Sequence, residues 1–261
     1  MRRIAEWIIR GGWPAAIDVP FDDAISIPRE YIRQVAANDI HRIDDIKRDV
    51  GKVDLLLRSL ARNETTTASI STLCSDMSEI DGAKVDPDTV ASYLNALARL
   101  FVLENQPPFH SSIRSTVRVK QTAKRHFCDP SIACALLKLT PQRLLGDLNF
   151  MGFLFEALVE RDLRIYCEGM NADLMHYQDY GNRELDAVVE MESGAWAAVE
   201  IKIGVNQEED AAARLVALRD EMKADPKGKP PESLVLIVGM SSAAYRRPDG
   251  VIVVPVGCLA P

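Results

Sequence analysis

Two short, uninterrupted apolar runs near the carboxyl end are the feature that most restricts how this chain can fold. Leu234–Gly239 has the sequence LVLIVG, and Gly250–Val256 has the sequence GVIVVPV. Runs this short, rich in Val and Ile and without alternation, are typical of central strands buried on both faces. A helical segment over 149–166, three strand-like segments at 175–179, 183–191 and 195–203, and a second helical segment over 207–222 precede them. Residues 146–261 therefore predict an α/β domain with the order α-β-β-β-α-β-β.

The preceding residues, 28–145, show mainly helical spacing. An apolar stripe occupies Ile43–Leu60 over several turns, and β-like stretches follow near 116–120 and 125–128. Helices followed by a small hairpin are the order of a winged helix, so we expect a helical, winged-helix-like domain here. A loop is expected over 140–148, which places a domain boundary near its centre.

A basic segment interrupts a chain that is acidic overall. The chain carries 31 Lys and Arg against 38 Asp and Glu, a net charge of −7, yet Asn105–Cys128 contains no Asp or Glu. Phosphate binding depends on where charge lies rather than on its total, so this segment predicts a DNA-contacting surface. The alternative is a solvated hairpin whose cations pair with acids such as Asp44, Asp45 and Asp49. The candidate DNA-binding residues are Arg114, Arg118, Lys120, Lys124 and Arg125.

A β-hairpin is predicted in the second half of the chain. Two alternating segments, 183–191 and 195–203, flank the tripeptide Glu192-Ser193-Gly194. A three-residue loop with glycine in the left-handed conformation is a common hairpin connection. Such a loop makes Met191 face Ala195, and this pair fixes the register of all the others.

The register brings charged side chains together on one face of the hairpin. Asp186 is opposite Glu200, and Glu184 is opposite Lys202. Two opposed carboxylates repel each other unless a counter-charge lies between them. A divalent cation would remove that penalty, and carboxylates on rigid strands suit Mg²⁺ or Mn²⁺. The other face is expected to be apolar, built from Leu185, Ala187, Val189, Val199, Ile201 and Ile203.

Lys202 lies on the charged face two residues from Glu200, where it can hold a nucleophilic water or stabilise charge on a phosphate. The alternative is a surface salt-bridge cluster in which Glu184 pairs with Lys202 while Asp186 and Glu200 are exposed. Alternation also places Trp196 on this face.

The hairpin motif resembles a known enzyme superfamily. Asp186 followed by Glu200-Ile201-Lys202, behind a helix that bears Phe155-Glu156, is similar to the PD-(D/E)xK restriction-endonuclease-like superfamily. The resemblance implies that Asp186 and Glu200 bind magnesium, that Glu156 adds a ligand, and that Lys202 assists attack on a phosphodiester. All four would be catalytic residues of a metal-dependent nuclease.

A second resemblance covers nearly the whole chain. The segments that carry it are GGWPAAI, RSLARN…TVASYLNALARLFVLE, RSTVRVK…RHFCDPSIACALL, GFLFEALVERDL and ELDAVVE…AVEIKIG. They resemble the carboxy-terminal module of the family of predicted ATPases with a domain of unknown function, DUF4143. In that family an ATPase domain precedes a winged helix and a nuclease-like domain, so residues 1–27 would be a remnant of the linker. The sequence contains no GxxxxGK[ST] loop, so we expect no ATP site here.

The expected function is therefore metal-dependent phosphodiester hydrolysis on DNA. The alternative is a non-catalytic DNA-binding or protein-interaction module that retains a nuclease scaffold, and an RNA substrate fits the same residues. An ATPase or a second copy of the chain are further candidate partners. The five scattered cysteines form no CxxC pair, and the apolar stretch at the start is too short for a signal peptide. These features predict a cytoplasmic protein that does not enter a membrane.

Overall fold

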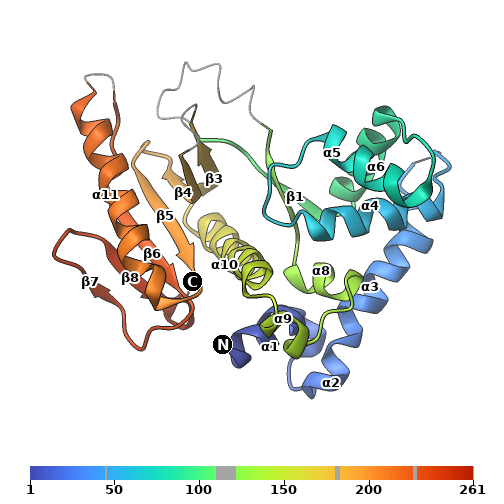
Figure 1. Ribbon diagram of the computed structural model, residues 1–261, viewed down its shortest axis with the longest axis horizontal. Coiled ribbons are helices and arrows are strands. Elements are labelled where there is room, and N and C mark those ends of the chain that lie inside the picture. Colours follow the sequence, from blue (N-terminus) through green and yellow to red (C-terminus); the bar gives the residue numbers. More distant parts are fainter. Residues whose placement is uncertain (45, 110–121, 180–182, 226–227, 261) are drawn as a thin grey trace. The chain divides into compact units, whose positions relative to one another are not determined.

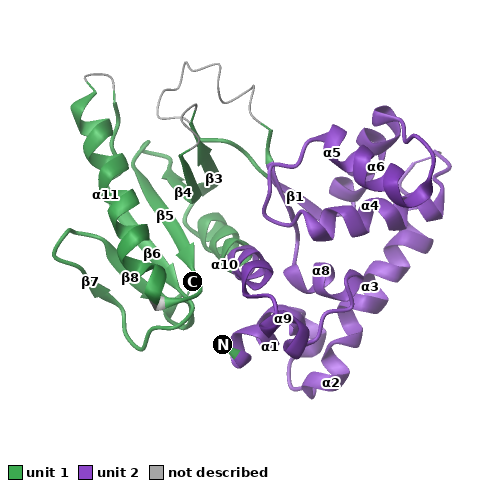
Figure 2. Cartoon of the chain, viewed as in Figure 1, with its two compact units in different colours: residues 1, 106–123, 159–261 green, residues 2–105, 124–158 purple. Residues whose placement is uncertain are grey.

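The computed structural model describes residues 1–44, 46–109, 122–179, 183–225 and 228–260 (Figure 1). The chain is a mixed α/β protein that divides into two units (Figure 2). Unit 1 comprises residues 1, 106–123 and 159–261, and unit 2 comprises residues 2–105 and 124–158. The expected domains, 28–145 and 146–261, were consecutive. The two units are not, because unit 1 takes in 106–123 and begins again at residue 159, inside a helix.

Unit 2 is mainly helical. Its two strands, β1 and β2, pair with each other as a small separate sheet. Among the described residues, no helix of either unit is long and apolar enough to cross a membrane. The elements in chain order are α1 (Arg2–Arg10), α2 (Phe21–Ala24), α3 (Ser26–Ala37), α4 (Val50–Arg62), α5 (Ile70–Asp81), α6 (Pro87–Arg99), β1 (Leu103–Gln106), β2 (Lys124–Phe127), α8 (Pro130–Leu136), α9 (Pro141–Leu145) and α10 (Leu148–Gly169), which continues into unit 1.

Local caps decide where the helices of unit 2 begin, and they correct two expectations. The carboxylate of Asp49 accepts the Lys52 N–H and starts α4 at Val50, so the first part of the stripe that begins at Ile43 is not helical. Thr140 caps α9 within the segment expected to be a loop, and Pro141 suits its first turn. Both caps satisfy N–H groups that have no partner inside the helix.

The segment after α1 docks on the start of α8. Gly12 donates its N–H to Asp129 Oδ2 at 2.8 Å, and the Trp13 indole donates to Ser131 Oγ at 2.8 Å. Asp129 also accepts the Ser131 N–H at 2.8 Å as the N-cap of α8. Gly11 makes the turn at φ +73°, a left-handed conformation that glycine adopts without strain. Two motifs far apart in sequence, GGWP and DPS, thus form one contact.

Unit 1 is built on a six-stranded mixed sheet with the strand order β3-β4-β5-β6-β8-β7. The first three strands are antiparallel, and β5, β6 and β8 are parallel. The two apolar runs form β6 and β8, which each have neighbours on both sides as expected. The elements are β3 (Ala172–Gln178), β4 (Glu184–Met191), β5 (Trp196–Lys202), α11 (Glu208–Ala224), β6 (Ser233–Val238), β7 (Tyr245–Arg246) and β8 (Ile252–Pro255).

Helix α11 lies across one face of this sheet and packs against β5 and β6 (Figure 1). Its inward residues Ala211 and Leu215 are fully buried in one apolar cluster with Trp196 and Leu236. Phe109, which precedes the sheet by many residues in sequence, belongs to the same cluster. The face of β5 that bears the predicted site is therefore covered by a helix and partly shielded from water.

Candidate functional site

The hairpin that carries the predicted site has the predicted register. Gly194 has φ +79°, and the Met191 N–H donates to the Ala195 carbonyl at 2.8 Å. The pair Ala187–Val199 has the register that the loop dictates. The three-residue loop was therefore a sufficient sequence signal for the alignment of β4 with β5.

A bulge on the other side of β4 corrects the expected faces. Met175 of β3 pairs with Val188, whereas Tyr177 pairs with Leu185, so β4 has one residue more than β3 between these two pairs. A bulge breaks the period-two alternation of a strand. Leu185 consequently lies in the core cluster with Val188 and Trp196, not on the opposite face.

The side chains of Asp186, Glu200 and Lys202 converge where β4 and β5 end their pairing. Lys202 Nζ lies 2.7 Å from Asp186 Oδ2 and 2.8 Å from Glu200 Oε2, so one ammonium bridges both carboxylates. The backbone N–H of Ile201 also donates to Asp186 Oδ2 at 2.7 Å. Glu184 instead accepts from Gln178 Nε2 at 2.7 Å. The contacts therefore differ from the salt-bridge alternative, in which Glu184 pairs with Lys202.

Burial and charge shift the protonation equilibria of this cluster. Glu200 is only 3% exposed, and burial followed by the charge of Asp186 raises the pKa of its carboxyl group. Burial by itself lowers the pKa of Lys202, but the attraction of Asp186 and Glu200 outweighs it and raises that pKa overall. Lys202 is therefore an ammonium at neutral pH. Burial disfavours the charged form of Glu200, and the positive charges of Lys202 and Arg214 counteract that effect.

The cluster opens into a cavity of about 420 Å³ in unit 1. Its polar lining comes from Arg183, Glu184, Asp186, Glu200, Lys202 and Arg214. Arg214 of α11 donates from its NH2 group to Glu200 Oε2 at 3.2 Å, while 55% of its side chain is exposed. Arg214 was not predicted from the sequence. It follows the inward Ala211 by three residues on the helix after the hairpin, and this i,i+3 spacing was the signal that could have found it.

Asp186 and Glu200 are the residues that can hold a metal ion here. In the part of the chain that the structure describes, no group of three or more His, Cys, Asp or Glu side chains gathers as a metal site. Mg²⁺ nevertheless keeps several waters and is commonly held by one or two carboxylates together with substrate phosphate. Two convergent carboxylates in a cavity meet that requirement, so the donor set fits a hydrated hard cation.

The other predicted site residues lie in unit 2 or outside the described residues. Glu156 of α10 is in unit 2, where it forms an ion pair with Lys124, which is itself buried. Arg125 donates from its guanidinium to the Ala68 carbonyl, and burial lowers its pKa. Both described cations of the basic segment thus have partners inside unit 2. The remaining predicted DNA-contacting residues lie outside the described residues, namely Arg114, Arg118 and Lys120.

Comparison with known families gives two matches along this α/β chain. The chain belongs to the family described as "Domain of unknown function (DUF8612)". The model of this family matches residues 1–143, which are more than half of the chain. Residues 151–259, which contain the hairpin site, match the model "Domain of unknown function (DUF4143)". This second match confirms the DUF4143 part of the resemblance seen in the sequence. Comparisons with curated proteins and with solved structures gave no match.

Proposed function

We propose that this protein is a metal-dependent nuclease that hydrolyses phosphodiesters in DNA with a PD-(D/E)xK-type site in unit 1. The observation that carries the proposal is the convergence of Asp186, Glu200 and Lys202 in one cavity. Two carboxylates that can bind a metal, and an ammonium that can stabilise negative charge, are groups suited to the hydrolysis of a phosphodiester. A winged-helix role for unit 2 in DNA binding is part of the same proposal.

Asp186 and Glu200 would hold Mg²⁺ or Mn²⁺, which when bound lowers the pKa of a water and offsets phosphate charge. The Ile201 N–H fixes Asp186 Oδ2 by its hydrogen bond of 2.7 Å, so this ligand is oriented before the metal arrives. Glu200 is held by Lys202 and Arg214. Glu156 stays a predicted further ligand.

Lys202 would contribute as a hydrogen-bond donor. In the metal-free chain, Asp186 and Glu200 raise its pKa and keep it an ammonium. An ammonium at this place can orient the attacking water or stabilise the charge that develops on phosphate oxygens. Arg214, exposed at the cavity rim, can contact the same phosphate.

The test is cleavage of supercoiled, linear and branched DNA by the pure protein with Mn²⁺ and with EDTA. We expect cleavage that EDTA abolishes and that Lys202→Ala lowers by about a hundredfold or more, the usual effect of removing one charge-stabilising donor. Arg246→Ala, an exposed arginine of unit 1 outside the cavity, is the matched control. Undiminished cleavage by folded Lys202→Ala protein would refute the mechanism.

One observation favours a second candidate, a non-catalytic binding module with a nuclease scaffold. Lys202 and Arg214 together already supply two positive charges to Asp186 and Glu200, so both carboxylates have a counter-charge without a metal. The same assay separates the two functions. Binding to DNA that weakens with salt, without metal-dependent cleavage of any DNA, would support the module. Cleavage of RNA alone would change the substrate class and keep the site.

A further inference from the structure

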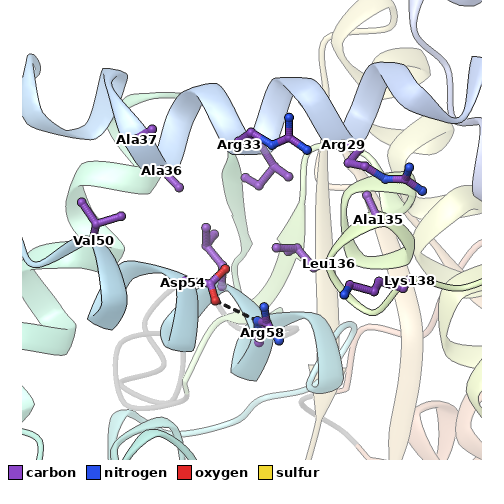
Figure 3. Close-up of a pocket in the computed structure, with 12 residues that line it drawn as sticks. Arg29, Arg33, Ala36, Ala37, Val50, Asp54, Arg58, Ala135, Leu136 and Lys138 are labelled. Carbon is purple, nitrogen blue, oxygen red and sulfur yellow. Dashed lines mark hydrogen bonds and ion pairs between the residues drawn. The ribbon is translucent and has the colours of Figure 1, made fainter. Parts of the chain in front are cut away.

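A second cavity lies in unit 2, built wholly from described residues that the proposed nuclease site does not use. Helices α3, α4 and α8, with the residues just after α8, enclose about 570 Å³ (Figure 3). Ile32 of α3 and Leu57 of α4 form a buried apolar floor, and Leu136 of α8 borders it. Clefts of this volume, mostly apolar with a few polar groups, are the usual sites of small ligands.

The two ends of this cavity differ in character because α3 and α4 run in opposite directions along it. Arg29 and Lys138 lie at one end, as Figure 3 shows. Ala36, Ala37 and Val50 lie at the other end. Val50 is 49% exposed, which leaves apolar surface at this end open to a ligand. The cavity therefore has a cationic end and an apolar end.

The cationic end carries charge that the protein does not neutralise. The other two cations of the lining have partners: Arg33 pairs with Glu30 at 2.9 Å, and Arg58 pairs with Asp54 at 2.9 Å. Within the described part of the chain, the Arg29 guanidinium and the Lys138 ammonium have no hydrogen-bond or ion-pair partner. Both residues are exposed and border the same end of the cavity, and an anion is the complement of two such unneutralised cations.

Lys138 is an unusual residue for its place. It follows the end of α8 at φ +53°, a left-handed conformation in which glycine is common and lysine is strained. A strained residue at the mouth of a cavity is often kept for what its side chain does. Here the side chain supplies one of the two unneutralised charges.

We propose that this cavity binds a small amphipathic carboxylate. Its carboxylate lies between Arg29 and Lys138, and its apolar chain lies over Leu57 toward Val50. The volume suits a medium-length acyl chain or an aromatic acid, and the charge at one end selects an anion over a neutral molecule of the same shape.

The test is calorimetric titration of the full chain with octanoate and with octan-1-ol, which share the chain and differ in charge. We expect octanoate to bind about tenfold or more tightly than octan-1-ol, the usual effect of hydrogen bonds to a charged group. Equal affinity for the two probes would overturn the proposal, since the cationic end would then play no part.

Variants distinguish the contribution of the cationic end to binding from that of the apolar end. Arg29→Ala with Lys138→Gly should weaken octanoate binding about tenfold and leave octan-1-ol binding unchanged. The glycine relieves strain, so loss of folding does not explain loss of binding. Ala36→Trp should block both probes by filling the apolar end. Lys84→Ala, an exposed lysine outside the cavity, is the control.

Three further results would contradict the proposal. The first is unchanged octanoate affinity in the Arg29→Ala, Lys138→Gly variant. The second is an equal loss of octanoate affinity in Lys84→Ala. The third is a dimer, detected by light scattering, that Ala36→Trp dissociates and that octanoate does not dissociate. That outcome would place a second copy of the chain in the cavity.

Discussion

At the scale of single residues, the convergence of three candidate side chains could be predicted, and their ion pairs could not. Asp186, Glu200 and Lys202 follow from the motif and the hairpin register, and the structure brings them together. In the surface salt-bridge alternative, Lys202 was expected to pair with Glu184, because the two residues are directly opposite each other in the register. Which carboxylates a long side chain reaches depends on burial under α11, and the pattern of a strand does not contain that information.

Asp44 provides a pH-dependent contribution to stability outside the site. Its carboxylate accepts hydrogen bonds from Arg48 at 2.7 and 2.9 Å, and these bonds lower its pKa from 3.8 to about 2. A carboxyl group whose pKa is lower in the folded chain stabilises the fold when ionised. This contribution is present above the ordinary pKa and is lost as the pH falls from 3.8 toward 2.

Asp44→Asn should therefore be less stable than the natural chain at neutral pH, and the gap should shrink as the pH falls through this range. Urea unfolding at a series of pH values measures the gap in free energy of unfolding. A gap that stays constant from neutral pH to pH 2 would show that ionisation of Asp44 does not contribute.

At the scale of elements, the hairpin loop predicted strand pairing correctly, whereas one strand face and two helix starts were predicted wrongly. The Glu192-Ser193-Gly194 loop fixed the register of β4 with β5, which the structure confirms. The face of Leu185 was wrong, because the bulge depends on how β3 pairs with β4. The sequence of β4 alone does not show that β3 has one residue fewer between the two pairs. Helix α9 was missed for a local reason, because it begins at a cap, Thr140, inside a segment that was expected to be a loop.

The docking of GGWP on α8 can be tested with two glycines of nearly equal conformation. Gly11 has φ +73° and Gly82 has φ +71°. A Cβ on Gly11 would collide with Ser131 Oγ and Asp129 Oδ1, whereas a Cβ on Gly82 meets nothing within 4 Å. Alanine at Gly82 should lower the free energy of unfolding by about 1–2 kcal/mol, the strain of a left-handed residue.

Alanine at Gly11 should lower it further, because it also disrupts the Gly12–Asp129 hydrogen bond and the cap of α8. Denaturant unfolding of both variants gives the comparison, with Gly82→Ala as the matched control for strain. Equal losses in the two variants would mean that this contact adds nothing to stability.

At the scale of the whole molecule, the two compact units are discontinuous in sequence, whereas the two family matches are continuous. The family matches are consecutive, at residues 1–143 and 151–259, and the sequence predicted a boundary between them. Unit 1, however, takes in 106–123 from within the first match. Phe109 donates its N–H to the His176 carbonyl at 2.6 Å, and its ring centroid lies 4.7 Å from that of Trp196. Nothing in its local sequence marks it as part of the later core.

This insertion predicts that the second family match does not fold stably when it is cut out alone. Phe109 is 1% exposed in the unit 1 cluster, so Phe109→Ala in the full chain should lower the stability of unit 1 by about 3–5 kcal/mol. A fragment of residues 146–261 lacks Phe109 altogether, together with the hydrogen bond to His176. It should therefore lose at least as much.

Trp196 reports the outcome directly, because it is the only tryptophan of that fragment. In the full chain Trp196 is 3% exposed, and its ring packs against that of Phe109 with an angle of 45° between the ring planes. We expect the fragment to show red-shifted tryptophan emission and no sharp unfolding transition. Blue-shifted emission with a cooperative transition would show that the sheet and α11 bury Trp196 without Phe109. The site at Asp186 and Glu200 would then rest on a domain that is continuous in sequence and does not need Phe109 to fold.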